Sequence, residues 1–149
     1  MHAVRRIFSL VLFSALATLW GCATIDKAPE SADQSAKQFN AVPGGSVIYV
    51  YRNESLGAAL SMPVTLNGKL AGTTGARSYL RLEVPAGTHN LASQGDGSKL
   101  TVTTEPGKVY YVWQEVKMGL VSGGSKLQIV PEDVGKKGVM ESALIQAAK

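Results

Sequence analysis

From Ser46 onward, short β-prone segments alternate with turns rich in Gly, Pro and Asn. In Tyr79–Val84 every second residue is aliphatic, and this period of two predicts a strand with one buried face. Asn67-Gly68 lies between two such segments and predicts a tight hairpin turn. The predicted strands are Ser46–Arg52, Pro63–Leu66, Lys69–Thr73, Tyr79–Val84, Thr88–Ser93, Lys99–Glu105, Lys108–Lys117 and Lys126–Val130. This spacing predicts a mainly β fold, a small antiparallel β-sandwich with about seven to eight strands.

The C-terminal segment Glu132–Lys149 has a different periodicity. Its apolar residues fall on one helical stripe, formed by Val139, Met140, Ala143, Leu144 and Ala147. Gly135 and Gly138 weaken the first turns, so we expect a helix mainly from about Gly138. Such a helix would cover a sheet edge or close one end of the sandwich.

The N-terminal segment combines a positive start with an apolar run. Arg5 and Arg6 precede the run over residues 7–20, which is too short for a comfortable transmembrane helix and typical of a secretory signal. The run ends at Gly21-Cys22, and the sequence Leu-Trp-Gly-Cys resembles a bacterial lipobox, from which Trp20 departs. We therefore expect residues 1–21 to be removed and Cys22 to be lipidated. An uncleaved anchor in which Cys22 is incidental is the alternative.

Residues 22–44 follow as a polar segment with two large apolar residues, Ile25 and Phe39. This composition predicts a flexible tether after the lipidated cysteine, with a span of roughly 25 Å. A short helix within Ser31–Phe39 is an alternative for part of it. Residues 45–149 are expected to form one β-sandwich domain with the C-terminal helix.

Charge excludes one class of partner. The chain has 15 basic and 11 acidic residues, and removal of Arg5 and Arg6 leaves 13 basic residues, a net charge of +2. The stretch from Ser46 to Gly135 is nearly neutral, with 8 basic and 7 acidic residues. Nucleic-acid binding needs a clustered basic surface, so no nucleic-acid partner is expected.

Several pieces of the sequence occur in an order that resembles a known family. These pieces are Ile48–Arg52, Val64–Lys69, Tyr79, Val84–His89, Pro106–Val112 and Met118–Leu120. Together they resemble bacterial lipoproteins with the domain of unknown function 2846, over roughly Ser46 to Gly138. The piece Val84–His89 (VPAGTH) also resembles PEGA-type envelope modules. The resemblance implies a small β-sandwich in the cell envelope, and it implies no reaction.

Candidate catalytic and metal-binding groups are scarce. The histidines are His2, which leaves with the signal, and His89, and Cys22 is the lone cysteine. A Cys/His metal site is therefore not expected, and neither is a cofactor. We expect His89 to bond the backbone of the turn before it. A hydrolase that uses His89 with Asp96 and a serine is the remote alternative, although no Gly-x-Ser-x-Gly motif is present.

Aromatic residues supply the first candidate binding site. Tyr49 and Tyr51 share one face of the first strand, and Tyr111 and Trp113 share one face of the longest strand. If these faces point outward, they form a stacking platform for sugar rings or a groove for a partner. If they point inward, they belong to the core.

The loop after the longest strand supplies the second candidate. Its glycines surround Met118 and Leu120, which it could present at a flexible tip. The alternative is a connection folded back onto the core. Its Gly-Ser-Lys order does not match a phosphate-binding loop, which requires Gly-Lys-Ser/Thr before a helix.

These features predict a membrane-anchored, non-enzymatic envelope lipoprotein that binds or supports an unidentified component. A carbohydrate- or peptidoglycan-binding module is the second hypothesis, and a hydrolase is the third. The expected partners are the membrane, through the lipid on Cys22, and an envelope protein or glycan. Ala23 follows the cysteine in place of the Asp that favours inner-membrane retention in lipoproteins resembling this one. It therefore predicts the periplasmic face of the outer membrane in a Gram-negative host.

Overall fold

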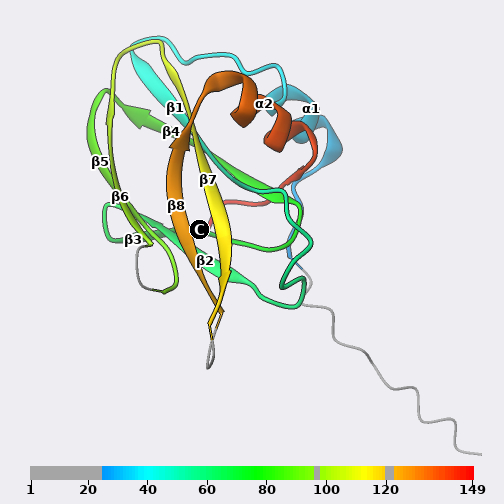
Figure 1. The fold of residues 1–149 in the computed structure, drawn as a ribbon. Coiled ribbons are helices and arrows are strands. Elements are labelled where there is room, and N and C mark those ends of the chain that lie inside the picture. The colour runs from blue at the N-terminus through cyan, green and yellow to red at the C-terminus, as the bar shows by residue number, and fades with distance from the viewer. Residues whose placement is uncertain (1–24, 96–97, 120–122) are drawn as a thin grey trace, which may run out of the picture.

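The computed structural model describes residues 25–95, 98–119 and 123–149 and shows two β-sheets packed face to face, with two short helices outside them (Figure 1). One sheet has the strand order β8-β7-β1-β4-β9, and the other has the order β3-β2-β5-β6. The strands are β1 (Gly45–Arg52), β2 (Met62–Leu66), β3 (Lys69–Thr74), β4 (Ser78–Pro85), β5 (Gly87–Ala92), β6 (Lys99–Thr104), β7 (Val109–Met118), β8 (Gly123–Val130) and β9 (Ala143–Leu144). The helices are α1 (Glu30–Ala36) and α2 (Glu132–Met140). The predicted fold class, a mainly β sandwich with a C-terminal helix, is confirmed.

Strands β1 to β8 coincide with the predicted strands to within a few residues, and β9 adds a short strand. The predicted hairpin joins β2 to β3. Asn67 (φ 50°) and Gly68 (φ 80°) both have positive φ, which a two-residue turn of the I′ type requires. Local turn chemistry and alternation were therefore sufficient to locate these strands.

Strand β1 occupies the centre of the five-stranded sheet. It pairs antiparallel with β4 and parallel with β7, with Tyr51 opposite Trp113 in the parallel pair. The pair of β4 and β9 is also parallel, so this sheet is mixed and the predicted antiparallel arrangement is wrong for it. The alternation within a strand does not fix the direction of a partner that is distant in the sequence. The central position of β1 explains why side chains on both of its faces are buried.

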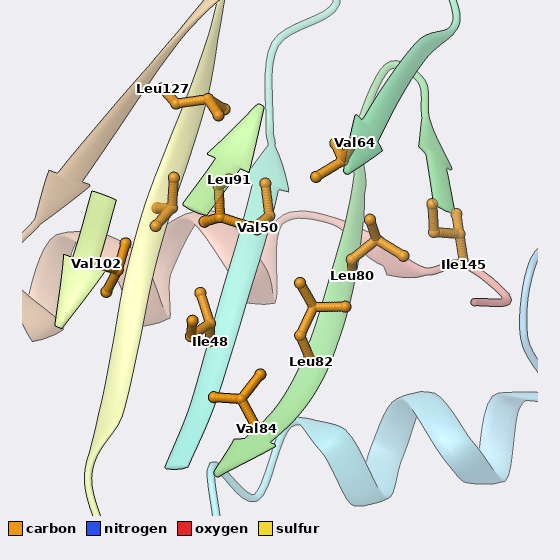
Figure 2. Packing of buried hydrophobic residues seen from close by; sticks show 11 residues of the cluster. Ile48, Val50, Val64, Leu80, Leu82, Val84, Leu91, Val102, Leu127 and Ile145 are labelled. Atoms are coloured by element: carbon orange, nitrogen blue, oxygen red, sulfur yellow. The ribbon is translucent and has the colours of Figure 1, made fainter. Parts of the chain in front are cut away.

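The first core fills the space between the two sheets (Figure 2). It consists of aliphatic side chains, which come mainly from alternate positions of the strands. The buried members are Ile48, Val50, Val64, Leu80, Leu82, Val84, Leu91, Val102, Val112, Leu127 and Ile145. The inward face predicted from the alternation in Tyr79–Val84 is therefore the observed one.

The second core lies on the opposite face of the five-stranded sheet, under α1 and α2 (Figure 1). It is largely aromatic, and its buried members are Ala36, Val47, Tyr49, Tyr51, Tyr79, Tyr111 and Val139. Phe39 and Trp113 pack against it. The molecule therefore has three layers, and the five-stranded sheet is the middle one.

The N-terminal segment is part of the fold, so the prediction of a flexible tether over residues 22–44 is wrong from Ile25 onward. The Ala28 amide donates to the Leu144 carbonyl (2.9 Å), and the Gln146 amide donates to the Asp26 carbonyl (2.9 Å). Helix α1 begins one residue before, and ends three residues before, the short helix predicted as an alternative. The segment has few apolar residues, but Ile25, Ala36 and Phe39 each pack against a core.

The C-terminal helix begins earlier and ends earlier than predicted. Helix α2 stops at Met140, and the chain then forms β9, so a helix that continues toward Lys149 is wrong. The glycines expected to weaken the first turns allow the helix to approach the sheet. A Cβ atom added at Gly135 would overlap the Tyr111 side chain, and one added at Gly138 would overlap the Tyr51 ring. Close packing thus outweighs low helix propensity here.

Candidate functional site

The predicted aromatic platform is a packed layer inside the protein. Tyr49 is fully buried, Tyr51 and Tyr111 are 2% exposed, and Trp113 is half-buried. The Tyr49 and Tyr111 rings stack with centroids 5.5 Å apart and planes 14° apart, and Phe39 covers Tyr49 at 5.5 Å. These rings contact one another and the helices, so the arrangement matches the second interpretation of the sequence, a core.

Hydrogen bonds fix the N-terminal segment over this layer. The Tyr49 hydroxyl donates to the Ala36 carbonyl (2.6 Å), and the Tyr79 hydroxyl donates to the Asp33 carboxylate (2.8 Å). Burial raises the pKa of Tyr49 and Tyr79, and it raises the pKa of Tyr51 to about 12. The hydroxyls of Tyr49 and Tyr79 therefore remain protonated donors at neutral pH.

Asp33 is the polar centre of this attachment. Its carboxylate also accepts bonds from Lys37 Nζ and from the Leu144 amide, both at 2.8 Å. Burial by itself would raise the pKa of Asp33, but the bonds from Lys37, Leu144 and Tyr79 hold that pKa below its ordinary value. Asp33 thus joins α1 to β4 and β9 as an ionised acceptor.

A shallow hollow lies beside the aromatic residues that were predicted to form a platform. It has a volume of about 290 Å³, and its lining includes Tyr51, Trp113, Val134 and Lys137. The indole Nε1 of Trp113 and the hydroxyl of Tyr111 are buried without a hydrogen-bond partner among the described residues. The structure therefore brings Tyr51 and Trp113 together at a small hollow rather than at a flat surface for sugar rings.

Met118, at the end of β7, is 60% exposed. For Met118 this exposure agrees with the first of the two interpretations of the loop, presentation of an apolar side chain, and not with a connection folded back onto the core. Leu120 lies outside the described residues, and so do Cys22 and Asp96. The predicted lipidation site and the acid proposed to accompany His89 have no structural description.

His89 lies on β5 with both ring nitrogens engaged. Its Nε2 bonds the Pro85 carbonyl (2.8 Å), which makes Nε2 the protonated donor. Its Nδ1 then accepts from the Asn67 side-chain amide (3.1 Å). These bonds join the β4–β5 turn to the β2–β3 turn, which is the backbone contact expected for a structural histidine.

Arg52 is a residue whose role the sequence did not indicate. It ends β1, is fully buried, and donates to the carbonyls of Leu60 (2.7 Å), Leu56 (3.0 Å) and Gly57 (2.6 Å). Burial lowers the pKa of its guanidinium below the ordinary value. A polar residue after an apolar run resembles a strand end in solvent, so no local signal predicted that Arg52 holds the β1–β2 loop in place.

The described residues offer neither a metal site nor a membrane-spanning helix. No three His, Cys, Asp or Glu side chains in the described ranges lie close enough together to hold a metal ion. Within the same ranges, no helix is long and apolar enough to cross a membrane.

Comparisons with known proteins place the chain in a family. Residues 43–125 match the model described as protein of unknown function (DUF2846). A Haemophilus influenzae protein described as uncharacterized is 31% identical over 142 residues, which cover 93% of this chain and 84% of the relative. No solved structure matches the chain. The chain therefore belongs to the DUF2846 family of proteins of unknown function.

Proposed function

We propose that this protein is a lipid-anchored, non-enzymatic module of the bacterial cell envelope. The observation that carries the proposal is the position of Cys22, which ends an apolar run and lies three residues before the first described residue, Ile25. A signal of this form directs export and attachment of lipid to the cysteine. Two or three acyl chains on Cys22 would hold the protein on a bilayer, because each buried methylene contributes about 0.8 kcal/mol.

A binding or supporting role agrees better with the side chains than catalysis does. His89 uses both ring nitrogens to join two turns, so its lone pair is not free to act as a general base. The aromatic residues that favoured a glycan-binding module are mostly buried under α1, α2 and Phe39. The partner we propose is therefore the membrane itself, together with an envelope protein that remains to be identified.

The test is Cys22→Ser in the full chain, expressed in a bacterial host with radiolabelled fatty acid. The wild-type protein is expected to incorporate the label and to sediment with membranes, and Cys22→Ser is expected to do neither. A Ser9→Ala variant, altered inside the apolar run, is the matched control and should behave like wild type. Wild-type protein without label would contradict the proposal.

The membrane that receives the protein is a separate question. Because Ala23 follows Cys22, we propose the outer membrane, with the domain on its periplasmic face, in a Gram-negative host. Density-gradient fractionation should place the protein with outer-membrane markers. Ala23→Asp is expected to move the protein to the inner membrane. Wild-type protein in the inner-membrane fraction would contradict the proposed outer-membrane location.

A further inference from the structure

The distance between the proposed anchor and the folded domain is short. Three residue steps separate Cys22 from Ile25, and they span at most about 11 Å however they are arranged. The headgroup layer on each side of a bilayer is about 5–8 Å thick. If Cys22 carries lipid, as proposed above, the part of the domain around Ile25 must lie at the headgroups.

Contacts identify the end of the sandwich that would face the bilayer. A Cβ atom added at Gly75, in the β3–β4 turn, would overlap the Ile25 side chain. Arg77 in the same turn donates from Nε to the Ser55 hydroxyl (3.0 Å) in the β1–β2 loop. These segments lie along the lower side of the molecule in Figure 1, where the described chain begins.

The tip of the β7–β8 hairpin belongs to the same end. A Cβ atom added at Gly123 would overlap the Leu60 side chain of the β1–β2 loop, so the loop and the hairpin tip touch. In Figure 1 the ends of β7 and β8 that meet at this hairpin also lie on the lower side. We call this end the anchor end, formed by the β1–β2 loop (53–61), the β3–β4 turn (75–77) and the hairpin tip at Met118 and Gly123.

The anchor end exposes two large apolar side chains, Leu56 (57% exposed) and Met118 (60% exposed). The other exposed large hydrophobic residues of the described chain, Leu70, Ile129, Val134 and Met140, lie on β3, β8 and α2. None lies in the turns of the opposite end, at residues 85–87 and 105–108. Apolar side chains on loop tips are suited to the boundary between headgroups and acyl chains.

The loop that carries Leu56 is held in place. Arg52, which is fully buried, donates to three of its carbonyls, including that of Leu56 itself. Glu54 in the same loop accepts from the Val116 amide (3.0 Å) on β7. Leu56 is therefore presented by a loop fixed to β1 and β7.

We infer that the anchor end docks on the lipid bilayer that holds Cys22, and that Leu56 and Met118 enter its interface. Arg77 and Lys117 are exposed beside them, although Lys117 also pairs with Glu115 (2.6 Å). The surface thus fits a bilayer through its apolar tips, with the exposed Arg77 beside the loop that carries Leu56. This inference rests on the proposed lipidation of Cys22.

The test measures where two labelled positions lie relative to the bilayer. The full lipidated protein is reconstituted in vesicles of phosphatidylethanolamine and phosphatidylglycerol that contain a lipid-borne quencher. An environment-sensitive fluorophore is attached to Met118→Cys or, as the matched control at the opposite end, to Glu105→Cys. Both residues are exposed, so neither change should disturb folding, and the lipid on Cys22 leaves one free thiol.

We expect quenching of the Met118 label to exceed that of the Glu105 label several-fold. A flexible Gly/Ser spacer of about 20 residues, inserted before Ile25, should reduce the Met118 quenching because the anchor would no longer hold the domain at the surface. Equal quenching of both labels on vesicle-bound protein would overturn the docking while leaving the lipoprotein proposal intact. Protein that carries no lipid and does not sediment with vesicles would overturn both.

Discussion

The two faces of the five-stranded sheet are covered in different ways. The aliphatic face is covered by the second sheet, whose strands alternate between apolar and polar residues. The aromatic face is covered by α1 and Phe39, from a segment that looks polar in the sequence, and by α2, whose helical stripe gave no indication of its bounds or of the face it covers. Periodicity in a sequence therefore locates a face that is covered by regular strands. A face that is covered by a few well-placed side chains leaves little periodic signal.

The largest expected effect is on the aliphatic face. Leu82→Asp places a carboxylate without a partner among aliphatic side chains, where Leu82 is 7% exposed. We expect the free energy of unfolding to fall by more than about 4 kcal/mol, and we expect no cooperative thermal transition by circular dichroism. Glu83→Ala, at the exposed neighbouring position, is the matched control and should melt near wild type. A wild-type melt for Leu82→Asp would refute the observed face assignment of β4.

A smaller effect is expected on the aromatic face at Gly138. Helix propensity alone would make Gly138→Ala stabilising by about 1 kcal/mol. The added Cβ would overlap the Tyr51 ring, so we expect net destabilisation by about 1–3 kcal/mol. Chemical denaturation of Gly138→Ala and of Lys137→Ala, which changes an exposed residue on the same helix, separates the two effects. If Gly138→Ala instead stabilises the protein, α2 must lie farther from the sheet than the structure shows.

The sequence could predict β1 to β8 because alternation and turn residues are local properties, as Asn67-Gly68 illustrates. It could not predict which segments cover the aromatic face, because their packing depends on close contacts between residues that are distant in the sequence. Gly135 is a poor helix residue until Tyr111 lies beneath it, and Asp33 is an ordinary surface acid until Tyr79 and Leu144 donate to it. For the same reason, the exposed or buried state of Tyr49 and Tyr51 remained open in the sequence.

The smallest effect is expected at Asp33, and it depends on pH. The folded-state pKa of Asp33 is lowered, so its contribution to stability is complete above the ordinary value of 3.8 and is lost as pH falls through the folded-state pKa. We expect Asp33→Asn to lower the free energy of unfolding by about 1–2 kcal/mol at neutral pH. In acid, the difference in this free energy between the variant and wild type should become smaller. Denaturation curves at pH 7 and pH 3 test this, with Glu30→Gln on the same helix as the control. A stability difference that does not change with pH would contradict the assignment of Asp33 as an ionised acceptor.

Residues 25–43 belong to the folded domain, and within them α1 and Phe39 cover the aromatic face. Hydrogen–deuterium exchange of the full chain tests this assignment most directly, because the Ala28 amide bonds the Leu144 carbonyl and the Lys37 amide bonds the Asp33 carbonyl. We predict exchange at both amides at least about 100-fold slower than in an unstructured peptide, with amides of β1 as the protected reference. Exchange at the unstructured-peptide rate throughout residues 25–43 would show that these residues form a flexible tether and not part of the folded domain.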